Sequence, residues 1–209
     1  MRAFLEQLAK ASPTGDGPER TWVYVPYDQL SHRIGPLADL KPSEAGIVMV
    51  ECPGKARRRP YHKQKLFLVL ANQRRFALEQ AGRGVQVRYL VAGEGEGYAE
   101  PLRAAAAELG PLLHMEPAER ELRAELEALV VDGLLETRPH EGWLTTADDF
   151  VKGTGAEAPW RMDRFYRHVR KRTGILMDSA GKYEGGKVSF DGENRLPWPG
   201  DPPAPDVPR

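Results

Sequence analysis

The residues best suited to chemistry lie in a basic segment, 55–65, that follows an apolar stretch, 45–51. The candidate ligand-binding side chains in this segment are Lys55, Arg58, His62 and Lys63. Open α/β sheets bind ligands at the carboxyl ends of their strands, next to helix N-termini whose free amides attract anions. The segment therefore predicts a site for a phosphate or another anion. The alternative is a solvated loop that balances acidic side chains elsewhere.

A second group of polar residues would reach the same edge of the sheet. It comprises Tyr27, Asp28 and Gln29, which follow the apolar stretch 21–26, together with Glu51 at the end of the next stretch. Asp28 could bond a ribose or a ring nitrogen, or it could cap the following turn. Tyr27 could contact a ligand or simply fill the cavity. No Gly-x-Gly-x-x-Gly follows residue 26, so the dinucleotide fingerprint is absent.

A third candidate is the basic stretch 161–172, in which six Arg or Lys residues accompany one acid, Asp163. The nucleic-acid-binding residues predicted here are Arg161, Arg164, Arg167, His168 and Lys171. Helical spacing places Arg161, Arg164, His168 and Lys171 on one side. Clustered cations bind DNA or RNA because they neutralise phosphates. The alternative is that they bind acids on the protein itself or on a partner.

The sequence offers little for catalysis or metal binding. The histidines lie far apart, without metal-ligand spacing, and no nucleophile elbow is present. Cys52 is the single cysteine, which excludes an intramolecular disulfide and fits a cytoplasmic protein. We expect Cys52 to be a small core residue, and we assign no catalytic or metal-ligating side chain.

Composition excludes a strong global field and a membrane span. Thirty Lys and Arg residues balance thirty Asp and Glu residues, so any affinity for nucleic acid must come from a local patch. No apolar run approaches the roughly 20 residues that a membrane-spanning helix needs. A membrane partner is therefore not expected.

The elements that must position these side chains alternate between strand and helix patterns. The predicted strands are 21–26, 45–51, 85–91, 112–117 and 133–138, and the helices between them are 62–81, 98–109 and 119–130. This alternation predicts an α/β fold with a doubly wound, mainly parallel, five-stranded Rossmann-like sheet. The expected parts are an N-terminal arm, 1–20, an α/β domain, 21–144, and a helical connector with a proline-rich, extended tail, 145–209. Thr145-Thr-Ala-Asp148 predicts a capping box near the start of the connector.

Several motifs in one order identify a family. They are Asp28-Gln-Leu-Ser31, His62-Lys-Gln-Lys65, Glu116-Pro117, Trp143-Leu-Thr-Thr146, the stretch from Trp160 to Gly174, and Phe190-Asp-Gly-Glu-Asn-Arg195. From about residue 22 to the end, the chain resembles the amino-terminal half of the deoxyribodipyrimidine photolyase-related proteins. These include bacterial cryptochromes and six-four photolyases with an iron–sulfur cluster.

The resemblance implies an α/β domain of the antenna type, which carries a lumazine- or flavin-like chromophore in relatives. A larger helical domain of the family holds FAD, the iron–sulfur cluster and the lesion site, and no FAD or cluster is expected in this chain. Tyr27 stands where relatives have a glycine, and Lys55 and Arg58 stand where they have an acid and a tyrosine. These changes alter the charge and the donors of the pocket, so we do not expect a lumazine to bind in the same way.

Three functional hypotheses follow from these observations. The first is a stand-alone photolyase-related domain, not catalytic by itself, that binds a nucleotide-like or anionic ligand or acts as an accessory subunit in DNA repair or light response. The second is a nucleic-acid-binding module that uses segments 55–65 and 161–172. The third is an antenna subunit of a split photolyase, whose partner would be a separately encoded helical domain.

Overall fold

The computed structural model describes residues 1–13 and 20–189, together with 192, 197, 199, 200, 203 and 206. It contains two compact units, Met1–Gly142 and Trp143–Arg209, and each is described here by itself. Most of the predicted proline-rich tail, and most of the motif at 190–195, lie outside the described residues. Within the described part of the chain, no helix is both long enough and apolar enough to cross a membrane.

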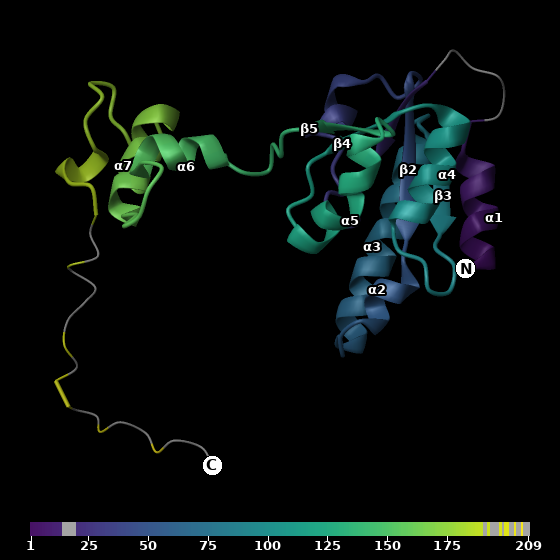
Figure 1. Cartoon of the computed structure of the whole chain (residues 1–209), viewed down its shortest axis with the longest axis horizontal. Helices are drawn as coiled ribbons and strands as arrows, with labels where there is room; N and C mark the ends of the chain where they lie inside the picture. The colour runs from purple at the N-terminus through teal and green to yellow at the C-terminus, as the bar shows by residue number, and fades with distance from the viewer. Residues whose placement is uncertain are drawn as a thin grey trace. The chain divides into compact units, whose positions relative to one another are not determined.

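The first unit is built on a parallel sheet of five strands, in the order β3-β2-β1-β4-β5 (Figure 1). The strands are β1 (Thr21–Tyr24), β2 (Ala45–Glu51), β3 (Gln86–Val91), β4 (Leu112–Met115) and β5 (Leu135–Arg138). Val23 of β1 lies opposite Ile47 of β2 on one side and Leu113 of β4 on the other. From β1 the chain adds β2 and β3 on one side and then β4 and β5 on the other, which confirms the predicted doubly wound α/β fold.

Helices cover both faces of this sheet. They are α1 (Arg2–Ala11), α2 (Pro53–Arg57), α3 (Lys63–Gly82), α4 (Ala99–Leu109) and α5 (Arg120–Val131), and a 3-10 turn, η1, spans Pro36–Asp39. One core cluster joins the sheet to α4 and α5, and the other joins it to α1 and α3. Every residue of β2 is buried, as its continuous apolar run predicts for a strand covered on both faces.

Close packing across β1 and β2 requires glycine at position 46. A Cβ atom placed there would lie 2.5 Å from a ring carbon of Trp22, closer than packed atoms approach one another. Trp22 fills the space over Gly46 and belongs to the core cluster that includes α4 and α5. The small residue therefore lets the indole lie flat against the backbone of β2.

The amino-terminal helix α1 packs against the first unit. Its Leu8 is buried, and the ring of Phe4 meets the ring of Tyr89 edge-on at 4.8 Å between centroids. The first three turns of α3 carry half-buried or exposed side chains, and Gln73 is its first fully buried residue. This protruding half of α3 supplies one wall of the pocket described below.

The second unit contains helices α6 (Ala147–Thr154) and α7 (Met162–Thr173) and a 3-10 turn, η2 (Glu184–Gly186). The capping box of α6 pairs Thr146 with Asp149, one residue later than the sequence pattern predicted. Helix α7 ends at Gly174, whose left-handed φ of 72° suits a glycine C-cap. The chain after α7 folds back on it, because the buried Arg170 donates to the carbonyl oxygens of Val188 and Leu176.

Candidate functional site

A pocket of about 420 Å³ lies at the carboxyl ends of β1 and β2, between α2 and the protruding half of α3. Its lining is mainly apolar and aromatic. The side chains that line it are Tyr27, Glu51, Cys52, Pro53, Lys55, Ala56, Arg57, Tyr61, Lys65, Leu66, Val69, Leu70, Gln73 and Tyr98. Of the ligand-binding residues predicted from the sequence, the pocket brings together Tyr27, Glu51 and Lys55.

Two tyrosines form an aromatic wall of this pocket. The rings of Tyr27 and Tyr98 are nearly parallel, at an angle of 24° and a centroid separation of 6.5 Å. The Lys55 ammonium lies 5.0 Å from the centre of the Tyr27 ring and 5.8 Å from that of Tyr98. This geometry offers a flat surface of the kind on which planar rings stack.

Lys55 is held in place by Glu119 at the start of α5. The Lys55 ammonium and the Tyr27 hydroxyl both donate to Oε2 of Glu119, the latter over 2.8 Å. Although partial burial alone would raise the pKa of Glu119, these two donors hold it below its ordinary value. Burial and the bond to Glu119 raise the pKa of the Tyr27 hydroxyl, so it remains a protonated donor.

The basic segment after β2 begins as the short helix α2 rather than as a loop. Proline at its first position favours this start, because its fixed φ suits a helix and its missing N–H would be unpaired there. The first four cations of the segment each face an acid, and the pairs are Lys55–Glu119, Arg57–Glu94, Arg58–Glu125 and Arg59–Glu121. Exposed pairs of this kind contribute about 0–1 kcal/mol each, so an anionic ligand can compete for the outer arginines.

At the end of β2 next to the pocket, Glu51 is engaged by the protein itself. Its carboxylate accepts two bonds from Arg74, of 3.0 and 2.8 Å, and one of 2.8 Å from the hydroxyl of Tyr89. Only 7% of the Glu51 side chain is exposed. Glu51 therefore anchors α3 to the sheet, and its role toward a ligand is limited.

The remaining predicted ligand-binding residues do not line the pocket. His62 caps α3, where its Nδ1 accepts the amide N–H of Gln64, and Gln29 is buried and donates to the carbonyl of Glu116. Asp28 is exposed, although partial desolvation by the surrounding protein raises the pKa of its carboxyl group. The other residues outside the lining are Arg58 and Lys63. A role in ligand binding stays a prediction for these residues, as it does for those that line the pocket.

Sequence reasoning missed Tyr61, Lys65 and Tyr98 as lining residues. Lys65 is exposed at the pocket and has no carboxylate within ion-pair distance among the described residues. Its ammonium lies 5.0 Å from the ring centre of Tyr61. The sequence could have indicated Lys65, because it lies four residues before Val69 and so on the same face of the predicted helix.

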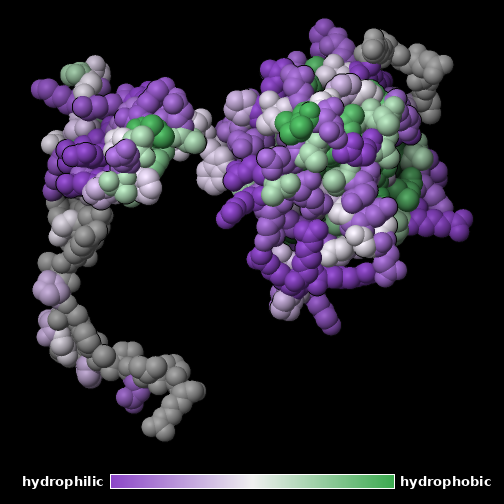
Figure 2. Space-filling view, in the orientation of Figure 1, coloured by the Kyte–Doolittle hydropathy of each residue, from purple (hydrophilic) through white to green (hydrophobic). Residues whose placement is uncertain are grey.

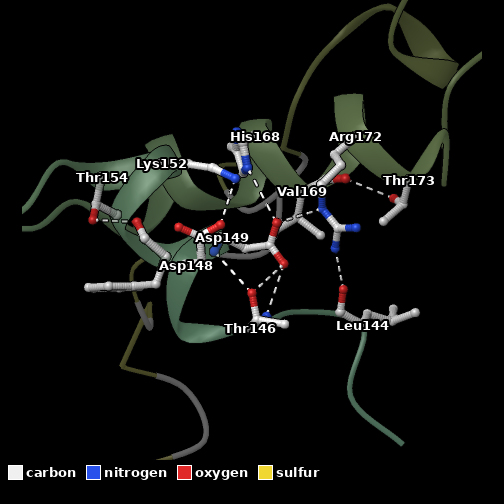
Figure 3. A network of polar contacts seen from close by, with 11 residues as sticks. Leu144, Thr146, Asp148, Asp149, Lys152, Thr154, His168, Val169, Arg172 and Thr173 are labelled. Carbon is white, nitrogen blue, oxygen red and sulfur yellow. Dashed lines mark hydrogen bonds and ion pairs between the residues drawn. The ribbon is translucent and has the colours of Figure 1, made fainter. Parts of the chain in front are cut away.

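In the second unit, Asp149 is the centre of a polar network that ties α6 to α7 (Figure 3). Its carboxylate accepts the amide N–H of Thr146 at 2.9 Å and forms an ion pair with Nε of Arg172 at 2.9 Å, while Nε2 of His168 lies 3.8 Å away. Arg172 also donates to the carbonyl of Leu144. The backbone bond from Thr146, together with these cations, lowers the pKa of Asp149.

The predicted nucleic-acid-binding residues in and next to α7 fall into two groups: some contact other residues of this unit, and the others are exposed without a carboxylate partner. His168 turns toward α6, and a Cβ atom at Gly153 would lie 3.1 Å from its own Cβ. Arg167 lies 3.9 Å from Asp163, four residues earlier, and Arg161 makes a closer pair with the same acid. Arg164 and Lys171 are exposed and have no carboxylate partner among the described residues. Among the exposed cations of α7, Arg164, Arg167 and Lys171 are therefore the ones without a close ion pair, and these three residues are called the exposed basic surface below.

The first unit is thus a doubly wound α/β domain with a pocket at the carboxyl ends of β1 and β2. The chain belongs to the deoxyribodipyrimidine photo-lyase-related protein family, whose model matches residues 23–209. It is also similar to a (6-4) photolyase of Agrobacterium fabrum, with 29% identity over 177 residues. That match covers 81% of this chain and 35% of the relative, so the chain spans about a third of that protein's length.

Proposed function

We propose that the first unit is a photolyase-related ligand-binding domain whose pocket holds a planar aromatic molecule with an anionic group. The observation that carries this proposal is the pocket of about 420 Å³ lined by Tyr27, Tyr61 and Tyr98, together with Lys65, which has no carboxylate partner among the described residues. Aromatic faces and an apolar wall favour a flat ring, and the lysine favours a negative charge on its substituent.

The size of the pocket narrows the ligand class. Small-molecule sites typically enclose about 300–1,000 Å³, and this pocket lies near the lower end of that range. One ring system with a short anionic chain therefore suits it better than a dinucleotide does. The absence of a glycine-rich phosphate loop after β1 agrees with this choice.

Whether the ligand absorbs visible light distinguishes two candidate roles of the domain. A ligand that absorbs visible light would make the chain an antenna subunit that acts with a separately encoded helical domain. A colourless, nucleotide-like ligand would make it an accessory subunit in DNA repair or light response.

A fluorescence titration with flavin mononucleotide and with uncharged riboflavin tests the charge requirement. Lys65→Gln should weaken binding of the mononucleotide by about tenfold or more, since a hydrogen bond to a charged group contributes roughly 1.5–3 kcal/mol. Riboflavin binding should change little. Lys63→Gln is the matched control, because Lys63 is on the same helix but does not line the pocket. An equal effect of both variants would contradict the proposal.

A second candidate function is nucleic-acid binding by α7. The observation that favours it is the exposed basic surface of Arg164, Arg167 and Lys171, which the acids among the described residues of its unit leave largely uncompensated. Phosphate contacts of this kind lose affinity steeply as salt rises.

Fluorescence anisotropy with labelled single- and double-stranded DNA tests this function at low and moderate salt. The double variant Arg164→Gln/Lys171→Gln should weaken binding. It should also reduce the slope of log K against log salt by the amount expected for about two lost phosphate contacts. Lys152→Gln is the control, because Lys152 is an exposed cation already paired with Asp148. Absence of any anisotropy change at low salt would refute the function.

A further inference from the structure

Strand β3 forms an open edge of the sheet. Among the described residues it pairs only with β2, and the N–H of Ala92, just after β3, donates to the carbonyl of Glu51 at 2.9 Å. Backbone groups of successive strand residues alternate in direction, so those of Val87, Tyr89 and Val91 point away from β2. The described hydrogen bonds supply no partner for these backbone groups. An edge of this kind is a template for another strand.

A groove of about 360 Å³ runs beside this edge, between β3 and α4. Its lining residues are Arg88, Leu90, Val91, Glu96, Glu100, Pro101, Ala104, Ala105, Glu108 and Leu109. The one guanidinium, of Arg88, is already paired with Glu108. Within the part of the chain that the structure describes, the carboxylates of Glu96 and Glu100 accept only the backbone amides of Gly93 and Gly97, so the groove keeps an excess of negative charge.

The two sides of β3 differ in chemistry. Arg88 and Leu90 line the acidic groove, whereas Tyr89 faces the opposite side and packs against Phe4 of α1. A strand added at the edge would place alternate side chains over these two surfaces, because side chains alternate across a strand. Figure 2 shows hydrophobic areas interspersed with hydrophilic ones on the visible face of the first unit.

We propose that the β3 edge binds an extended segment of a partner protein that carries Lys or Arg at every second position and apolar residues between them. Main-chain bonds to Val87, Tyr89 and Val91 hold the segment, and its cations lie over Glu96, Glu100 and Glu108. A second copy of this chain is a poorer occupant. Symmetric pairing of two β3 edges would bring two acidic grooves together, and like charges repel.

The test uses the full chain and the peptide Lys-Val-Lys-Val-Lys-Val, with amide hydrogen exchange read residue by residue. The expected result is peptide-dependent protection of the amides of Val87, Tyr89 and Val91. A Glu-Val peptide of the same length should give no protection, because its carboxylates meet those of the groove.

A matched pair of variants locates the site. Val91→Lys adds a charge to the edge and should weaken peptide binding by about tenfold, since edge lysines block strand addition. Val131→Lys makes the same change at an exposed position on α5, outside the groove, and should leave binding within about twofold. Both valines are exposed, 44% and 80%, so neither change disturbs the core.

Three outcomes would overturn the proposal. The first is equal binding of the Lys-Val and Glu-Val peptides, which would indicate unspecific adhesion. The second is equal loss of binding in both variants, or protection confined to residues outside β3. The third is concentration-dependent protection of β3 without peptide, which would make a second copy of the chain the occupant.

Discussion

Replacing Arg74 with methionine is expected to destabilise the first unit by about 2–4 kcal/mol. Arg74 supplies both charged hydrogen bonds to Glu51, whose side chain is 7% exposed, and its own side chain is 30% exposed. Removing one partner of a buried pair costs about 3–5 kcal/mol, and the partial exposure of Arg74 reduces this somewhat. Of the described residues, Tyr89 alone would remain as a side-chain donor to the unpaired carboxylate.

A double-mutant cycle separates this charge effect from lost packing. Glu51→Gln alone, Arg74→Met alone and the double variant are compared by urea denaturation followed by circular dichroism. The double variant should be more stable than Arg74→Met, because no uncompensated charge is left behind. If Arg74→Met costs less than about 1 kcal/mol, or if the two losses simply add, the pair does not anchor α3 to the sheet as described.

Two further predictions concern the core of the first unit. Burial lowers the pKa of His114 to about 4, so the unfolded chain takes up a proton that the folded chain does not between about pH 6.5 and 4. As the pH is lowered over that range, the free energy of unfolding should therefore fall by at most about 1.4 kcal/mol per pH unit. His114→Leu should reduce this dependence of the unfolding free energy on pH, and the same dependence in the variant would contradict the assignment. Gly46→Ala should cost about 1–3 kcal/mol in urea denaturation because of Trp22. Gly82→Ala, with open space around it, should be neutral or slightly stabilising, and equal losses would refute the packing argument.

Hydrophobic pattern was enough to predict the sheet and its helices. The buried run of β2 and the helical spacing of α3 are properties of neighbouring residues, so they can be read from the chain directly. The short helix α2 was not predicted because its cations, Lys55 and Arg57, were assigned together with those that follow it to one basic segment. Pro53 at its first position was the signal that indicated a helix start.

Whether a predicted cation is free or paired with an acid could not be predicted from the pattern of neighbouring residues. Lys55 and Glu119 are 64 residues apart, and only the folded sheet brings the end of β2 next to the start of α5. The same holds for His168, which pattern placed with Arg164 but which the packing of α6 on α7 turns toward Asp149. Pairing between distant segments is a property of tertiary structure, so sequence spacing alone over-predicts free cations.

The most direct test of the pocket is a calorimetric titration of the wild-type chain and of Val69→Trp with flavin mononucleotide. Val69 lies on the α3 wall and is half-buried, so an indole there would occupy the pocket without entering the main core. We predict that the wild-type chain binds the mononucleotide and that the variant loses binding by at least about tenfold while keeping its unfolding midpoint. Equal binding by both proteins would show that the ligand does not enter this pocket and would contradict the proposed function.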